Sequence, residues 1–172
     1  MSKIDNQQVH LQRRVVRTIG IAQVLNGVGV AGTVAAGSLL VAAISDSESL
    51  AGLAQTTSVL GAAMMALPLA RLTHKGGRRL ALMSGYLIGV IGAIFAIIGG
   101  AEKILVLMLL GTFMVGAASA AGYQARFAAI DLATPERRAK DLSFVVWGST
   151  IGAVTGPNLM DPAGAIAESL SL

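Results

Sequence analysis

The chain has no cysteine, few aromatic residues and few charged ones. Without cysteine, these 172 residues hold no disulfide, no thiolate metal site and no thiol nucleophile. Aromatic residues make up 4% of the chain and charged residues 13%, whereas about 25% of a typical soluble domain is charged. Hydrophobic residues make up 54%, mostly small and aliphatic types that let helices pack closely in lipid. The composition therefore favours a membrane protein over a soluble domain.

Charged side chains and histidine are also missing from five long stretches, and these stretches define the expected fold. They are residues 18–44, 50–70, 80–100, 104–125 and 142–160. About 20 residues of α-helix, at roughly 1.5 Å per residue, cross a hydrocarbon core of about 30 Å. The stretches lack the alternating polarity of barrel strands, and an open sheet edge cannot be satisfied in lipid. We predict an all-α integral membrane protein with about five transmembrane helices.

The basic residues predict how these helices are oriented. Twelve of the 13 lysines and arginines lie in residues 1–17, 71–79 and 126–140, and Lys103 is the exception. By the positive-inside rule these three segments are cytoplasmic. We expect a cytoplasmic tail at residues 1–17, a helical bundle at 18–160 and an extracytoplasmic tail at 161–172. Because the first apolar stretch has 27 residues, longer than a signal-peptide core, we expect it to be retained as a span.

Amide side chains are the candidates for solute contact within the uncharged spans. Gln23 and Asn26 lie three residues apart, so both can point to one side of the first helix. A buried amide in lipid needs a partner, which is either a neighbouring helix or a cavity holding solute or water. Asn158 either bonds the carbonyls that the preceding proline frees or faces the same cavity. No metal site or cofactor is expected, because His10 and His74 have no second ligand at a suitable spacing.

Small residues recur at four-residue spacing in two of the stretches. In the fifth they are Gly148, Gly152 and Gly156, followed directly by Pro157, and a similar stripe lies in residues 85–93. This spacing lets two helix backbones approach closely in lipid. The proline lacks a backbone donor and is expected to kink its helix.

The segment between the second and third stretches carries a family signature. Residues 70–79 read ARLTHKGGRR, which resembles the Gly-x-x-x-Asp-Arg/Lys-x-Gly-Arg-Arg/Lys signature between helices two and three of the major facilitator superfamily. Lys75, Gly77, Arg78 and Arg79 match, whereas His74 stands where the family has aspartate. The resemblance implies that these residues belong to a cytoplasmic gating loop. The alternative is a basic segment that only anchors the topology.

Two further segments extend the resemblance. Residues 152–157, GAVTGP, look like the Gly-x-x-x-Gly-Pro element in helix five of the drug/proton antiporter branch. Residues 123–144 are similar to the end of helix four and the loop after it, where an aspartate pairs with the signature arginines. The resemblance implies contact of Asp131 with Arg78 or Arg79, and independent solvated charges are the alternative. Thr112 stands where many proton-driven exporters of the family carry arginine.

Together these resemblances imply the N-terminal portion of a secondary active transporter. A full member has about twelve spans in two halves, so this chain would be a fragment that does not transport alone. We expect an exporter of a small solute in the plasma membrane. Its expected partners are the lipid bilayer, a small-molecule solute, and a missing C-terminal half or second subunit.

Other functional classes are less favoured by the same residues. Nucleic acid is not an expected partner, because the basic residues form no long solvated face. An enzyme is disfavoured, because no acid–base pair lies within any span. The main alternative is a small multi-span membrane scaffold or assembly subunit whose glycine stripes bind partner helices.

Reporter fusions test the predicted orientation. Reporters placed after Ser47 and after Glu102 should read outside, and reporters after Gly76 and after Glu136 should read inside, because the basic segments stay in the cytoplasm. The reverse pattern at either pair would contradict the orientation.

Overall fold

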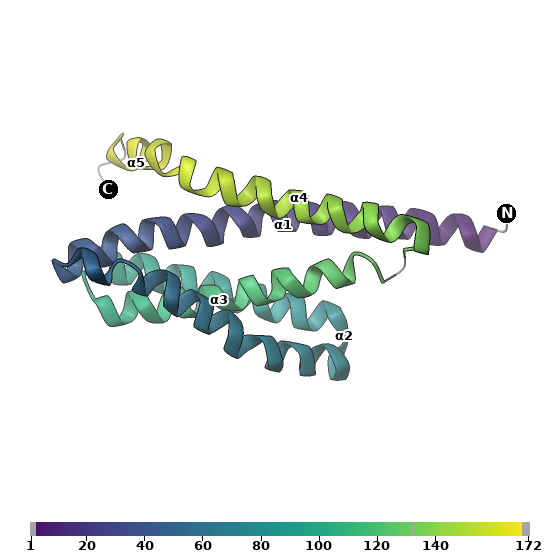
Figure 1. Cartoon of the computed structure of the whole chain (residues 1–172), viewed down its shortest axis with the longest axis horizontal. Helices are drawn as coiled ribbons and strands as arrows, with labels where there is room; N and C mark the ends of the chain where they lie inside the picture. Colours follow the sequence, from purple (N-terminus) through teal and green to yellow (C-terminus); the bar gives the residue numbers. More distant parts are fainter. Residues whose placement is uncertain (1–2, 132, 170–172) are drawn as a thin grey trace.

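The chain folds as helices joined by short connections (Figure 1). The computed structural model describes residues 3–131 and 133–169, with side chains in residues 9–131 and 133–165. The elements are α1 (Lys3–Ser45), the 3-10 helix η1 (Glu48–Leu50), α2 (Leu53–Ala101), α3 (Leu105–Ala128), α4 (Pro135–Asn158) and α5 (Met160–Ser169). The described part contains no strand, and the predicted all-α fold is confirmed.

A sharp break at Gly77 divides α2 into two arms, residues 53–76 and 78–101. Gly77 has φ of 82° and ψ of 163°, a conformation that a residue with a Cβ rarely adopts. The chain reverses there, and the arms contain the predicted spans 50–70 and 80–100 almost entirely. The glycine of the family signature is therefore the residue that allows the turn.

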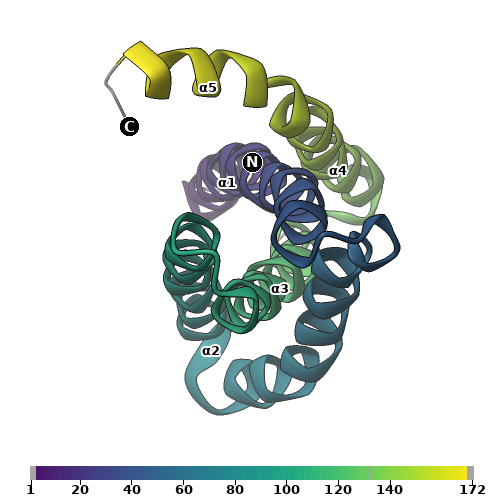
Figure 2. The same ribbon diagram turned by 90° about the vertical axis from the view of Figure 1, so that its left-hand side faces the viewer.

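The helices pack as two pairs. The most extensive packing is between α2 and α3 and between α1 and α4, whereas α3 and α4 barely touch. Figure 2 shows α1 beside α4, and α3 between the two arms of α2. We call these units the α1–α4 pair and the α2–α3 pair.

Glycines bring the backbones of α1 and α4 together. A Cβ added to Gly148 would lie 2.8 Å from the carbonyl oxygen of Gly20, and one added to Gly156 would lie 2.7 Å from that of Val28. A Cβ on Gly152 would collide with the carbonyl of Val24. The stripe expected to contact another helix therefore lies against α1.

The α2–α3 pair is built in the same way. A Cβ added to Gly85 would lie 2.6 Å from the Cβ of Ala121, and one added to Gly89 would lie 2.5 Å from the Cβ of Ala118. Small side chains on both helices thus let α3 sit close against the second arm of α2.

In the described part of the chain, three helical segments are long and apolar enough to cross a membrane. They are Val9–Ser45, Glu48–Ala101 and Leu105–Ala128. The second would be about 80 Å long as a straight helix, so the break at Gly77 makes it two crossings. The first two turns of α4 carry Glu136, Arg137, Arg138, Lys140 and Asp141, and α4 is not among the three. The crossing by residues 142–160 stays a prediction.

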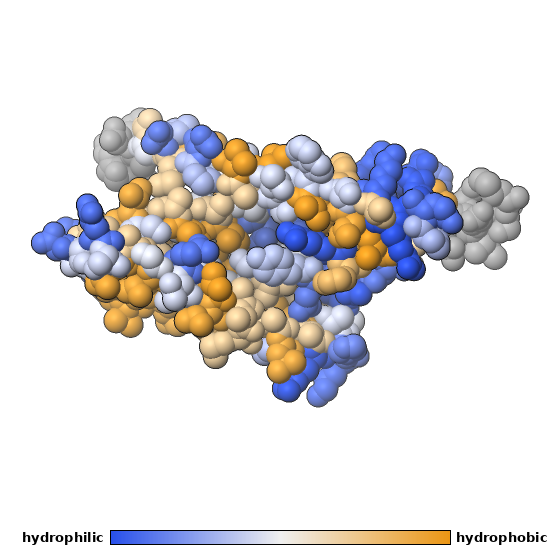
Figure 3. All heavy atoms as spheres, viewed as in Figure 1, coloured by the Kyte–Doolittle hydropathy of each residue, from blue (hydrophilic) through white to orange (hydrophobic). Residues whose placement is uncertain are grey.

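Hydrophilic residues gather at the two ends of the molecule, with hydrophobic residues between them (Figure 3). The N-terminus, the turn of α2 and the connection from α3 to α4 lie at one end, which brings the three basic segments together. This is the arrangement that a single cytoplasmic surface requires. Which side of the membrane that end faces stays a prediction.

Both predicted tails are helical where they are described. The N-terminal residues 3–17 continue α1, because Val16 packs with Ala129 and Val145 in a buried cluster. In the C-terminal tail, α5 runs from Met160 to Ser169 and turns across the end of α4 after Pro157 (Figure 2). Residues 1–2 and 170–172 of the tails lie outside the described residues.

The start of α4 follows from local chemistry. Pro135 occupies the first turn, where its missing N–H costs no hydrogen bond. Glu136 follows it at the positive end of the helix dipole. Hydrogen bonds from its own backbone N–H and from the side chain of Thr134 hold the pKa of the Glu136 carboxyl below its usual value.

Substitution of Gly152 tests the α1–α4 contact. Gly152→Ala should lower the thermal unfolding midpoint in detergent, at a cost of about 1–3 kcal/mol from overpacking. Gly29→Ala is the matched control, because an added Cβ there meets nothing within 4 Å. The control should be neutral or slightly stabilising, since alanine favours helix by about 1 kcal/mol over glycine. Equal midpoints for the two variants would contradict the close contact.

Candidate solute-binding cavity

A cavity lies between the two helix pairs. It has a volume of about 610 Å³ and is lined by α1, α3 and α4, with Gln55 of α2 at its edge. A second hollow of about 420 Å³ adjoins it and shares five lining residues, namely Val30, Val34, Gln55, Ser119 and Tyr123. We call the two hollows together the central cavity. The polar residues of the larger hollow are Gln23, Asn26, Gln55, Ser119, Tyr123, Arg126, Ser149 and Thr150.

Gln23 joins the two helix pairs at this cavity. Its side chain is 1% exposed, and its Nε2 donates to the carbonyl of Gly122 on α3 at 3.1 Å. A side chain at position 122 would crowd both amides, because a Cβ there would lie 3.1 Å from Oε1 of Gln23 and 2.7 Å from Nδ2 of Asn26. Gln23 Oε1 is buried and has no partner in the described part of the chain. The amide nitrogen of Gln23 thus bonds α3, whereas its amide oxygen is left to accept a bond from a further partner.

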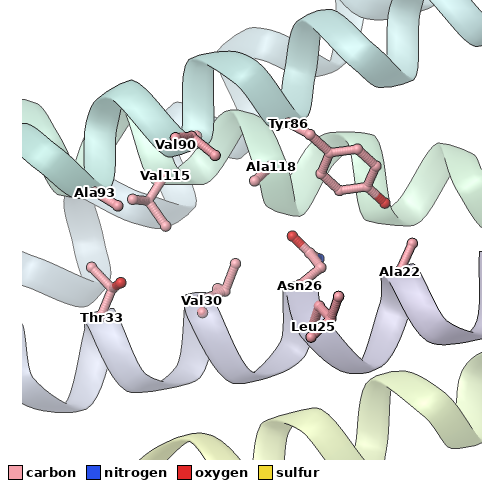
Figure 4. Close-up of a pocket in the computed structure, with 12 residues that line it drawn as sticks. Ala22, Leu25, Asn26, Val30, Thr33, Tyr86, Val90, Ala93, Val115 and Ala118 are labelled. Atoms are coloured by element: carbon pink, nitrogen blue, oxygen red, sulfur yellow. The ribbon is translucent and has the colours of Figure 1, made fainter.

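Asn26 lines the central cavity and also a separate side pocket of about 340 Å³. Figure 4 shows it pointing from α1 across this pocket toward Ala118 and Tyr86. The hydroxyl of Tyr86 is buried there without a partner among the described residues. The structure therefore brings Gln23 and Asn26 to one cavity, whereas their contact with a solute stays a prediction.

Asn158 is not brought to the central cavity. It is exposed, and its Nδ2 donates to the carbonyl of Val154 on its own helix at 2.7 Å. The carbonyl that Pro157 leaves without its helical donor is that of Ala153, so Asn158 bonds the neighbouring one. Pro157 itself lines the cavity. The cavity role expected for Asn158 is not supported by this position.

The sequence predicts a topology role for the charge of Arg126, and the structure places its side chain at the central cavity. It lies within α3, where the guanidinium stacks over the ring of Tyr123 at 5.2 Å from the ring centroid. Its Nη2 donates to the hydroxyl of Ser149 on α4 at 3.3 Å, and its Nε is buried without a partner among the described residues. The spacing of Tyr123 and Arg126 by three residues, on one face of a helix, was the available signal.

The residues of the expected gating loop surround the turn at Gly77. Arg78 holds Asp131 in a bidentate pair, with its Nε near Oδ2 and its Nη2 donating to Oδ1 at 2.8 Å. The two side chains are 39% and 42% exposed, so the pair contributes about 0–1 kcal/mol. His74, Lys75 and Arg79 are exposed. The contact implied by the family resemblance is present with Arg78, and its gating role stays a prediction.

Two buried polar contacts lie away from the cavity. Thr112, at the position where many exporters carry arginine, is fully buried and 2.7 Å from the hydroxyl of Thr57. Near the basic end, Nε2 of Gln12 donates to Asp141 and to the carbonyl of Ala129, both at 2.8 Å. These contacts tie α2 to α3, and α1 to α4 and the end of α3.

The described residues thus form a partly polar cavity between glycine-packed helix pairs, with a glycine turn and an arginine–aspartate pair at one end. The family profile described as Major Facilitator Superfamily matches residues 17–164. This chain belongs to the Major Facilitator Superfamily. No solved structure matches it.

Curated relatives in this superfamily are longer than the chain. Two uncharacterized MFS-type transporters of Bacillus subtilis (strain 168), YdeG and YddS, are 34% and 32% identical over 166 residues, which is 96% of this chain and 39% and 38% of theirs. The riboflavin transporter RfnT of Brucella anthropi is 31% identical over 148 residues, 86% of this chain and 37% of its own length. The chain thus spans less than two fifths of these transporters.

A double-mutant cycle tests the Arg78–Asp131 pair. Arg78→Gln and Asp131→Asn should show a coupling of about 0.2–1 kcal/mol in thermal unfolding, toward the upper end because the pair is bidentate. Arg79→Gln with Asp131→Asn is the matched control and should show none, since Arg79 is exposed one residue away. Coupling to Arg79 instead of Arg78 would overturn the assignment.

Proposed function

We propose that the protein moves a small solute across the plasma membrane by alternating access, with the central cavity as one wall of the path. The observation that supports this is a cavity between two tightly packed helix pairs, whose mainly apolar lining includes several polar side chains. Substrate sites in transporters of this kind lie near the middle of the bilayer, at the interface of helical repeats. The opposite wall comes from helices of the missing C-terminal half or of a second subunit. This chain alone therefore does not transport.

The proposed direction is export. It is supported by the resemblance of residues 152–157 to the antiporter element, whose Pro157 lines the central cavity. Thr112 cannot supply the positive charge that arginine provides at this position in many exporters, because its hydroxyl is neutral. Proton coupling thus needs groups from the rest of the transporter. Because a relative is named a riboflavin transporter, riboflavin serves as an uncharged reference solute in transport assays.

The alternative of a scaffold subunit rests on glycine stripes that could bind partner helices. The stripe of Gly148, Gly152 and Gly156 packs on α1, and Gly85 and Gly89 pack on α3. Both stripes are thus used within the chain, and they are not available to partner helices.

Filling the central cavity with a large side chain distinguishes a transporter from a scaffold subunit. In cells that express the complete reading frame, Ser119→Trp should abolish the protein-dependent change in distribution of the solute between cells and medium, measured by mass spectrometry. The indole would fill the hollow that Ser119 lines. Ile97→Trp is the control, because Ile97 is 70% exposed and lines neither hollow.

The control should retain the full change in solute distribution. A scaffold would be indifferent to the plug, and its partner would co-purify equally with both variants. Equal solute distributions in cells with the plugged and unplugged proteins would therefore contradict the proposed transport.

A further inference from the structure

The central cavity carries a cation and no acidic side chain. Arg126 is the charged residue among those lining the larger hollow, and the adjoining one has none. The hydrogen bond from Arg126 to Ser149 is 3.3 Å long, beyond the usual range for a nitrogen donor. Its Nε is buried without a partner in the described part of the chain. A guanidinium offers five donors, so Arg126 is poorly satisfied.

A second arginine of the same chain shows what satisfies such a group. The Nε and Nη2 of Arg78 are both taken by the carboxylate of Asp131, although that pair is well exposed and contributes little. Arg126 has a buried Nε and no acidic partner within ion-pair distance among the described residues. Since an unpaired charge is more costly inside a protein than at its surface, the missing anion matters more at Arg126.

The neighbours of Arg126 cannot supply that anion. The hydroxyl of Ser149 is already committed as a donor to the carbonyl of Val146 at 2.7 Å, so it accepts one bond from Arg126 and carries no charge. The ring of Tyr123 covers one face of the guanidinium, which leaves its edge for hydrogen bonds. On the α1 wall, the amides of Gln23 and Asn26 offer neutral polar groups to the remainder of a solute.

We propose that the transported solute carries a carboxylate, and that Arg126 binds it within the central cavity. A carboxylate matches the planar fork of a guanidinium and forms charge-assisted hydrogen bonds with it. This inference rests on the proposed function, because it assigns the occupant of the cavity. It makes Arg126 the residue that selects solutes by charge.

Three probes of one shape test the charge preference. Benzoate, benzamide and benzylamine differ in the charge of one small group and are compact enough for a cavity of about 610 Å³. Their binding to the purified protein in detergent is measured by calorimetry at fixed ionic strength. Benzoate should bind at least about tenfold more tightly than benzamide, since bonds to a charged group contribute about 1.5–3 kcal/mol. Benzylammonium should bind most weakly.

Substitutions assign that preference to one residue. Arg126→Gln should reduce benzoate affinity to that of benzamide, and Arg126→Lys, which keeps the charge without the fork, should retain part of the preference. Arg71→Gln is the matched control, because Arg71 is exposed and lines neither hollow. It should leave all three affinities unchanged. If Arg126→Gln does not fold, the comparison between Arg126→Lys and Arg71→Gln decides.

Two outcomes would overturn the inference. One is equal binding of benzoate and benzamide to the unsubstituted protein, which is expected if Arg126 only marks the end of α3. The other is a preference for benzoate that survives every change at Arg126. Either result leaves the proposed function intact if Ser119→Trp still abolishes the change in solute distribution, so the two failures are distinguishable.

Discussion

Close approach of helix backbones at glycine is the constraint on which the rest of the structure depends. Lipid tails are as apolar as leucine side chains, so burial of apolar surface does little to join helices in a membrane. Helix association therefore depends more on dispersion contacts between backbones, and these contacts are strong only at short range. Gly148, Gly152 and Gly156 supply this contact on α4, and Gly85 and Gly89 supply it on α2. The result is two compact helix pairs.

The cavity lies between these two glycine-packed pairs. We call the boundary between the two pairs the seam. There α3 and α4 barely touch, and α1 packs on α2 and α3 less extensively than the helices within each pair, partly through the buried cluster of Val41, Ala54 and Met108. Beside the cavity the seam is crossed by single polar contacts, such as Gln23 to Gly122 and Arg126 to Ser149. A few hydrogen bonds of about 1 kcal/mol each are easier to exchange than a continuous glycine contact. The same arrangement that leaves room for a solute therefore leaves the two pairs less tightly joined to each other than internally. A transporter that alternates between states needs both properties.

The sequence predicted the parts of this arrangement that local chemistry decides. Charge-free stretches located α3 and the second arm of α2 to within about three residues, whereas α1 begins at Lys3 and not at residue 18, and α4 at Pro135 and not at residue 142. The glycine of the signature located the reversal at Gly77. The pairing of Asp131 with Arg78 came from resemblance to the family, since 53 residues separate them. The three-residue spacing places Arg126 beside Tyr123 once α3 continues to Ala128, beyond the predicted end of the span at residue 125. No local pattern shows that α3 meets Ser149, so the place of Arg126 at the cavity comes from the structure. Asn158 bonds the carbonyl of Val154 on its own helix, and its contact with a solute stays a prediction.

The most direct test of the account is the water accessibility of single cysteines, since the chain has no cysteine of its own. A charged, water-soluble thiol reagent should modify Ser119→Cys in the seam. It should not modify Val145→Cys, which is fully buried beside α1, or Ile97→Cys on the exposed outer face of α2. That pattern is predicted if glycine contacts exclude water from the interior of each pair while water enters the cavity between the pairs. Modification of Val145→Cys as fast as Ser119→Cys, or no modification of Ser119→Cys, would contradict it.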